Sequence, residues 1–190
     1  MNNTYTIEQS PFMYIFTSST KSAPFWLIVR LYLGYEFFMA GWEKLLNPAW
    51  FGSDAGASLQ GFVNGAVAKT VCAPTVAASA CHPAVQMWYA SFLESTVLPH
   101  LTLWSNAVVV GELLIGLGLI VGLFTGVAAF FAFFMSLNFL LAGTVSTNPI
   151  LITLAIGLVS ARRVAGYWGL DYYARPFLKR RFRSRGFTYK

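Results

Sequence analysis

The chain has 190 residues, of which 56% are hydrophobic, 17% aromatic and only 11% charged. A soluble domain usually carries about 25% charged residues, so this chain has too few to cover a soluble surface. The composition excludes an ordinary cytosolic enzyme, a disordered chain and a small disulfide-rich secreted protein. It indicates a small integral membrane protein.

Apolar stretches occur in four places along the chain, and a transmembrane helix needs about 20 mostly apolar residues. We predict helices over residues 24–46, 101–124, 125–143 and 148–164. Glycine-containing turns at 122–126 and 143–149 separate the last three, and Pro149 suits the first turn of a helix. The predicted fold is an all-α integral membrane protein, a four-transmembrane-helix bundle with a long outward loop between helices one and two.

The basic residues gather after the fourth predicted helix, which fixes the expected orientation. Nine of the 13 lysines and arginines lie there: Arg162, Arg163, Arg175, Lys179, Arg180, Arg181, Arg183, Arg185 and Lys190. We therefore expect a multi-pass protein of a prokaryotic cell membrane with both termini cytoplasmic. Its parts are a cytoplasmic segment 1–23, a membrane domain 24–164 with an outward loop 47–100, and a basic tail 165–190. The tail suits contact with anionic lipid, whereas no folded basic surface indicates nucleic-acid binding.

The long outward loop contains helical patterning of its own. Val85, Trp88, Tyr89, Phe92 and Leu93 recur at helical spacing before Pro99, and residues 59–69 form a second candidate helix. Such helices would lie on the outer face of the membrane or cap the bundle.

Polar side chains within the predicted spans are candidate functional residues, because charge in lipid is costly. Glu36 and Glu112 lie about 18 Å and 16 Å into their helices, near the middle of a hydrocarbon core about 30 Å thick. Two interpretations remain open. Arg30 and Glu112 form an ion pair that only joins two helices, or Arg30, Glu36, Trp42, Glu112 and Asn138 line a polar pocket. Such a pocket would exchange protons with a redox-active lipid such as a quinone.

Cys72 and Cys81 lie in the predicted outward loop, where an oxidising environment favours a disulfide. The bond would either hold the loop together or act as a redox pair, although redox pairs usually have closer spacing. With His82 and His100 these cysteines show no standard metal-ligand spacing. No sequence motif indicates flavin, haem or nucleotide.

Two glycine-rich segments resemble a known family: RLYLGYEFFMAGWEKL at 30–45 and GELLIGLGLIVGLFT at 111–125. They are similar to the DoxX superfamily of small four-helix membrane proteins. The amphipathic segment before the second span and GYWGLD at 166–171 are more similar to its DoxD branch. The resemblance covers roughly residues 26–176.

The resemblance to DoxD implies the membrane subunit of a thiosulfate:quinone oxidoreductase, which oxidises thiosulfate to tetrathionate and reduces quinone. It implies quinone as cofactor, and a separate DoxA-like subunit or a larger membrane complex as partner besides membrane lipid. In this scheme Cys72 and Cys81 accept the electrons at the outer face. The alternative is a non-catalytic accessory subunit of a respiratory or photosynthetic complex, so enzymatic activity is left open.

Overall fold

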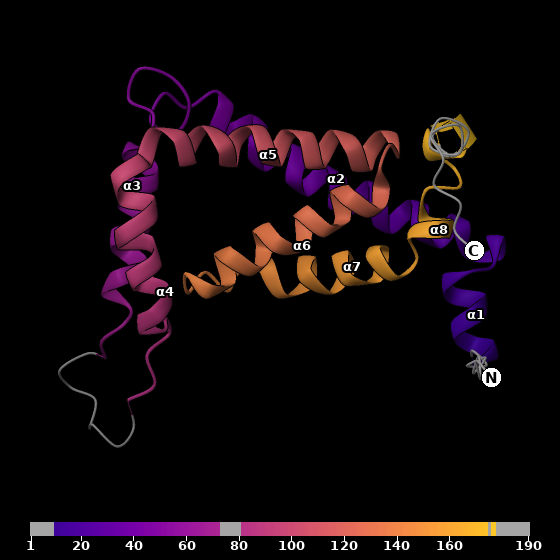
Figure 1. Ribbon diagram of the computed structural model, residues 1–190, viewed down its shortest axis with the longest axis horizontal. Helices are drawn as coiled ribbons and strands as arrows, with labels where there is room; N and C mark the ends of the chain where they lie inside the picture. The colour runs from indigo at the N-terminus through magenta and orange to yellow at the C-terminus, as the bar shows by residue number, and fades with distance from the viewer. Residues whose placement is uncertain (1–9, 73–80, 175, 178–190) are drawn as a thin grey trace, which may run out of the picture.

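The computed structural model describes residues 10–72, 81–174, 176 and 177, and every regular element in these ranges is helical (Figure 1). The predicted all-α fold is therefore confirmed. In chain order the elements are α1 (Pro11–Thr17), η1 (Thr20–Ser22), α2 (Ala23–Leu45), α3 (Ala57–Ala68), α4 (Met87–Phe92), η3 (Leu93–Val97), η4 (Leu98–His100), α5 (Leu101–Val121), α6 (Thr125–Leu141), α7 (Asn148–Ser160) and α8 (Arg162–Ala165).

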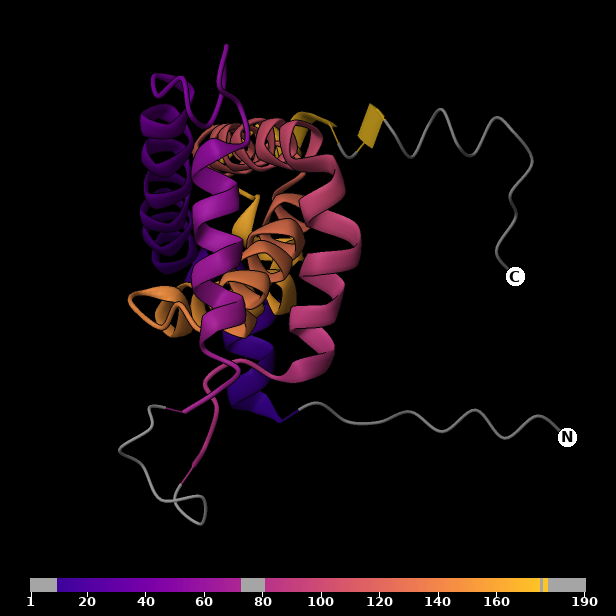
Figure 2. The same ribbon diagram turned by 90° about the vertical axis from the view of Figure 1, so that its left-hand side faces the viewer.

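Four helices, α2, α5, α6 and α7, run lengthwise through the molecule, whereas α3 and α4 stand across one end of them (Figures 1 and 2). The segments α1 and α8 lie at the opposite end. The four long helices pack mainly as two pairs, α2 with α5 and α6 with α7. The bundle therefore has a cap of two helices at one end and short helices at the other.

The four long helices occupy the four predicted apolar stretches, and the predicted turns separate them. Gly122 ends α5 with φ of 72° and Gly143 follows α6 with φ of 73°, a left-handed conformation that favours glycine. Pro149 lies in the first turn of α7. The fourth helix is shorter than predicted: α7 ends at Ser160, and α8 is a separate turn after it.

Length and apolar composition identify one membrane-length stretch among the described residues, Met87–Val121, with 35 residues. It comprises α4, η3, η4 and α5, and the chain changes direction between α4 and α5 (Figure 1). Pro99 lies in η4 between them, and its ring cannot continue regular helical hydrogen bonding. Two shorter apolar helices follow, α6 with 17 residues and α7 with 13. Helix α2 has 23 residues and carries four charged side chains.

The predicted loop helices form the cap. Leu59, Val63 and Ala66 of α3 pack against Tyr89 and Leu93 in one apolar cluster. Lys69 adds a hydrogen bond from its Nζ to the carbonyl oxygen of Gly143, at a distance of 3.0 Å, which ties the end of α3 to the segment after α6. The outward loop is thus a packed layer over one end of the bundle.

Glycines let α2 and α5 approach closely. A Cβ atom on Gly116 of α5 would lie 2.5 Å from the backbone nitrogen of Phe38 in α2, and one on Gly34 would lie 3.1 Å from the carbonyl oxygen of Gly116. A Cβ on Gly41 would lie 2.9 Å from the backbone nitrogen of Leu113. Small residues at such contacts are the usual way in which membrane helices pack backbone to backbone.

This contact yields a stability prediction. Gly116→Ala should lower the free energy of unfolding by about 1–3 kcal/mol, because the new methyl group meets backbone that cannot move aside. Gly61→Ala is the matched control, since nothing lies within 4 Å of a Cβ there in α3. Unfolding in detergent micelles measures both variants. Equal stability of Gly116→Ala and the control would contradict the close packing of α2 on α5.

Candidate functional site

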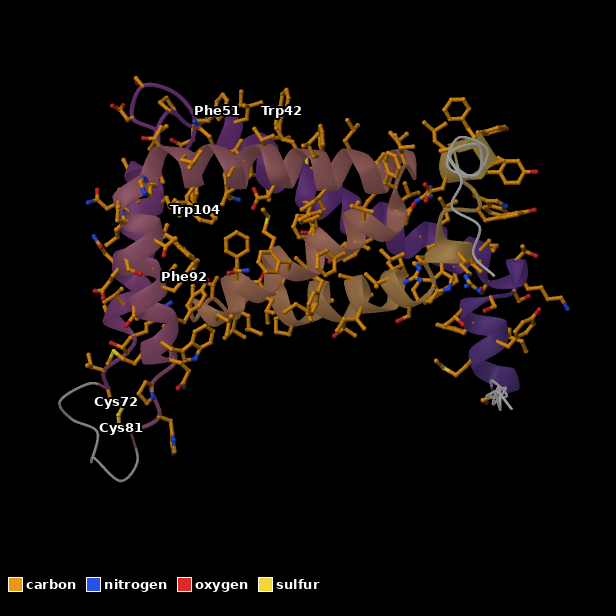
Figure 3. All side chains as sticks on the ribbon, viewed as in Figure 1. Trp42, Phe51, Cys72, Cys81, Phe92 and Trp104 are labelled. Atoms are coloured by element: carbon orange, nitrogen blue, oxygen red, sulfur yellow. A yellow bond between two sulfur atoms is a disulfide. The ribbon has the colours of Figure 1, made fainter. Side chains whose placement is uncertain are left out.

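An apolar cavity of about 510 Å³ lies between the cap and the adjoining parts of α5 and α6. Phe92 of α4 and Trp104 of α5 lie where the cap meets the bundle (Figure 3). The cavity is lined by Leu59, Phe62, Val63, Tyr89, Phe92, Leu93, Val97, Trp104, Ala107, Val108, Gly111, Leu114, Ile115, Phe131, Phe134, Met135, Asn138 and Phe139. It exists because α5 packs against α2 and α6 against α7, so that the cap spans the seam between the pairs.

Three of these lining residues carry polar side-chain groups, Tyr89, Trp104 and Asn138, and the Trp104 indole N–H already donates to the carbonyl oxygen of Thr96 at 3.1 Å. The Tyr89 hydroxyl donates to the backbone oxygen of Asn138 at 3.0 Å, or to its Oδ1 at 3.1 Å. Asn138 Nδ2 donates to the carbonyl oxygen of Phe134 at 2.8 Å. A hydroxyl oxygen also accepts hydrogen bonds and an amide nitrogen carries two hydrogens. The pair therefore retains one acceptor and one donor for a ligand.

A second apolar cavity of about 380 Å³ continues along the seam between α5 and α6. Leu114, Ile115 and Phe131 line both cavities, so the two adjoin. The second reaches Val121 and Phe124 at the turn between α5 and α6. Together they form an apolar path along the seam, from the cap toward the other end of the bundle.

A buried ion pair lies beside the cavity wall. Lys44 Nζ is 2.7 Å and 2.8 Å from the two carboxylate oxygens of Glu112, whose side chain is only 2% exposed. The ammonium also lies 6.0 Å from the ring centre of Phe139, which lines the cavity. Lys44 is in the last turn of α2, where the helix dipole favours a cation. The pair joins α2 to α5 near the cap.

Arg30 lies at the opposite end of α2 and holds the segment after α7. Its Nη1 donates to the carbonyl oxygen of Ala165 at 3.2 Å and its Nη2 to that of Trp168 at 3.1 Å. The guanidinium fits between Gly122 and Gly169, where a Cβ on either glycine would collide with it. Gly122 and Gly169 therefore leave the space that the Arg30 guanidinium occupies.

Asp171 adds two further hydrogen bonds at this end of the bundle. Its two carboxylate oxygens accept hydrogen bonds from the backbone N–H groups of Phe124, at 2.8 Å, and Thr125, at 3.0 Å. These are otherwise unpaired donors at the start of α6, where a carboxylate is favourable. The GYWGLD segment at 166–171 therefore joins α2, α6 and the turn after α5, and its role in the structure is to fasten the end of the bundle.

The structure does not bring the five predicted pocket residues together. Asn138 lines the cavity, and Glu112 lies beside its wall. Arg30 is bound at the far end of the bundle, whereas Glu36 and Trp42 lie on the outward face of α2. Trp42 stacks on Phe38 and is 44% exposed (Figure 3).

The Arg30–Glu112 ion pair, one of the two interpretations that the sequence left open, does not form, because Glu112 pairs with Lys44 and Arg30 with backbone carbonyls. Lys44 shares a helix face with Arg30 at a spacing of 14 residues. Because α2 and α5 run in opposite directions, the Lys44 end of α2 lies beside Glu112. Lys44 rather than Arg30 is therefore the partner of Glu112. The sequence interpretation also missed Tyr89 as a polar group of the site and treated it as part of an apolar stripe.

Cys72 and Cys81 form a disulfide at the end of the cap away from α5 (Figure 3). The bond joins the segment that leaves α3 to the segment that leads into α4. The residues between 73 and 80 lie outside the described part of the chain, as do Arg175, Lys179, Arg180, Arg181, Arg183, Arg185 and Lys190 of the basic tail.

Comparison with protein families identifies the family to which the chain belongs. The DoxX family matches residues 25–144, which include α2, the cap, α5 and α6. The chain belongs to the DoxX family and is a membrane protein. Comparison with curated proteins and with solved structures gives no significant match.

The buried ion pair yields a prediction about stability. Lys44→Met leaves the Glu112 carboxylate buried without its partner, which should cost about 3–5 kcal/mol. The double variant Lys44→Met/Glu112→Leu removes both charges and should recover most of that loss. A double-mutant cycle of unfolding in detergent measures the coupling. A double variant as unstable as the single one would contradict the role of the pair.

Proposed function

We propose that α2, α5, α6 and α7 all cross the membrane, with the cap on the outer face and with α1 and α8 at the cytoplasmic end. Two observations support this topology. The cap and the short end helices lie at opposite ends of the bundle (Figure 1), and Arg162 and Arg163 begin α8 at the end assigned to the cytoplasm. Basic residues favour that side of a membrane.

The length of α7 is compatible with crossing. Its 13 residues extend about 20 Å, which is less than a hydrocarbon core about 30 Å thick. The turn of α8 extends the same segment, and a bilayer thins locally around short spans. Two of the four charged residues of α2, Arg30 and Lys44, are paired with protein groups, which makes their charge tolerable in a span.

We propose that the cavity beneath the cap binds an isoprenoid quinone and that the chain is the membrane subunit of a quinone-linked oxidoreductase. This proposal rests on one observation: the apolar cavity is rich in aromatic side chains and contains the polar Tyr89–Asn138 pair. A quinone has a flat ring that packs between aromatic side chains and carbonyl oxygens that accept hydrogen bonds. The free hydrogen of Asn138 Nδ2 is the donor for one of them.

The seam between α5 and α6 suits the isoprenoid tail. The second cavity adjoins the first and is lined by apolar side chains such as Leu117 and Val127. A ring held at Tyr89 and a tail extending along α5 would orient the quinone with its head toward the outer face. Lys44 and Glu112 stand beside this head position, and we assign them as the nearby groups that hold a proton.

By resemblance to DoxD, we propose thiosulfate as the electron donor and a separate DoxA-like subunit as partner. Two thiosulfate ions join through a new sulfur–sulfur bond to form tetrathionate and release two electrons. The quinone takes up these two electrons with two protons and becomes a quinol. The membrane chain supplies the quinone site. The spacing of its Cys72–Cys81 disulfide favours a structural role, and electron acceptance at the outer face is the alternative role of this pair.

A variant that fills the cavity tests quinone binding. Ala107 lines the cavity on α5, and Ala107→Trp should occupy the space of the ring and weaken binding of a quinone analogue at least tenfold. Val110→Trp is the control, since Val110 is exposed on the same helix and does not line the cavity. Binding is measured on purified protein in lipid nanodiscs. No binding by the unaltered protein would contradict the proposal and favour the non-catalytic accessory subunit.

The double variant Cys72→Ser/Cys81→Ser tests the disulfide. If the bond only holds the cap together, the variant loses about 2–4 kcal/mol of stability and keeps thiosulfate-dependent quinone reduction below its unfolding temperature. Loss of that reduction with unchanged quinone binding would instead assign the electron-accepting role to the pair. Activity and quinone binding are measured on the same membranes. We expect the first outcome, because the spacing of the cysteines is wider than in redox pairs.

A further inference from the structure

The outward face of α2 differs from the outward faces of the other long helices. Tyr32 and Tyr35 are exposed there, with Tyr35 at 58%, and Glu36 is half-buried beside them. Outside the two cavities, the exposed large side chains of α5, α6 and α7 are apolar: Leu103, Val110, Ile120, Phe130, Ile150 and Ile156. The apolar side chains on α5, α6 and α7 are compatible with contact to lipid, whereas the polar groups on α2 are not.

The polar groups on α2 lie deep in the proposed span. Tyr32 and Glu36 follow Ala23 by 9 and 13 residues, or about 14 Å and 20 Å along the helix. Within the described part of the chain, neither the two tyrosine hydroxyls nor the Glu36 carboxyl has a hydrogen-bond or ion-pair partner. A carboxyl group and two hydroxyl groups that face hydrocarbon without partners are costly.

We propose that this face of α2, defined by Tyr32, Tyr35 and Glu36, binds a transmembrane segment of a different protein that carries a lysine or arginine at the depth of Glu36. A cation at that depth would compensate the carboxylate. The two hydroxyl groups beside Glu36 would add hydrogen bonds to the same segment. Apolar side chains alone on the partner would leave all three polar groups unpaired.

A second copy of this chain does not meet the requirement. The cations within its spans are already bound, Lys44 by Glu112 and Arg30 by the carbonyl oxygens of Ala165 and Trp168. A symmetric contact of two α2 faces would bring two Glu36 carboxylates together, and like charges repel. The charge on the face therefore favours a partner of different sequence.

This inference rests on the part of the proposed function in which α2 crosses the membrane, and it is independent of quinone. The test incorporates a benzophenone amino acid at position 35 of the full chain and irradiates native membranes. Position 156 of α7 is the matched control, because Ile156 is 50% exposed and lies among apolar side chains. Cross-linked peptides and lipids are identified by mass spectrometry.

The expected result is a cross-link from position 35 to a foreign transmembrane segment with Lys or Arg within one helical turn of the attachment point, and lipid adducts from position 156. Glu36→Lys should then reduce the protein cross-link at least tenfold, and exchange of the partner's basic residue for Glu should restore it. Glu36→Gln should give an intermediate yield.

Three results would overturn the proposal: a cross-link to a second copy of this chain, a foreign segment without a basic residue there, or lipid adducts alone at position 35. Lipid adducts at that position would leave the proposed topology standing. Benzophenone forms no adduct with water, so absence of both protein and lipid adducts at position 35, together with lipid adducts at position 156, would show that α2 lies outside the bilayer and would refute that part of the topology.

Discussion

Lys44 and Glu112 meet beside the glycine contacts that bring α2 and α5 together, and this close backbone contact makes the meeting possible. Gly41 lies against the Glu112 Cβ, so Lys44, one helical turn further along α2, reaches the carboxylate. At the other end Gly122 and Gly169 leave room for the Arg30 guanidinium, which holds the segment before Asp171. The helix pair is thus joined by polar contacts near both ends, and every other element is positioned against it.

The cavity follows from this arrangement. Because α5 packs mainly on α2 and α6 mainly on α7, the seam between α5 and α6 is packed less tightly than either of these pairs. The cap then closes one end of this seam with Tyr89 and Phe92, and Tyr89 meets Asn138 of α6 there. The same packing of the helices therefore produces the apolar cavity, the Tyr89–Asn138 pair within it and the neighbouring Lys44–Glu112 ion pair. These are the features that a quinone site requires.

Hydrophobic length and glycine position predicted the helices and turns, since both depend on nearby residues. Gly122 and Gly143 adopt left-handed conformations where the turns were expected. The partner of Glu112 could not be predicted in the same way, because Arg30 and Lys44 share a face of α2 and only the pairing of the helices selects Lys44. Tyr89 was assigned correctly to a helical stripe, but its hydroxyl meets Asn138 only after the cap folds onto α6.

A quinone held in the cavity beneath the cap should stay with the protein when it is extracted from its own membrane. The protein would be purified in mild detergent, its bound lipid extracted and quantified, and a photoactivatable quinone mapped onto the chain. We expect about one isoprenoid quinone per chain, with labelling confined to the elements that line the cavity, α3, α4, η3, α5 and α6. Phospholipid without quinone, or labelling on α7, would contradict it.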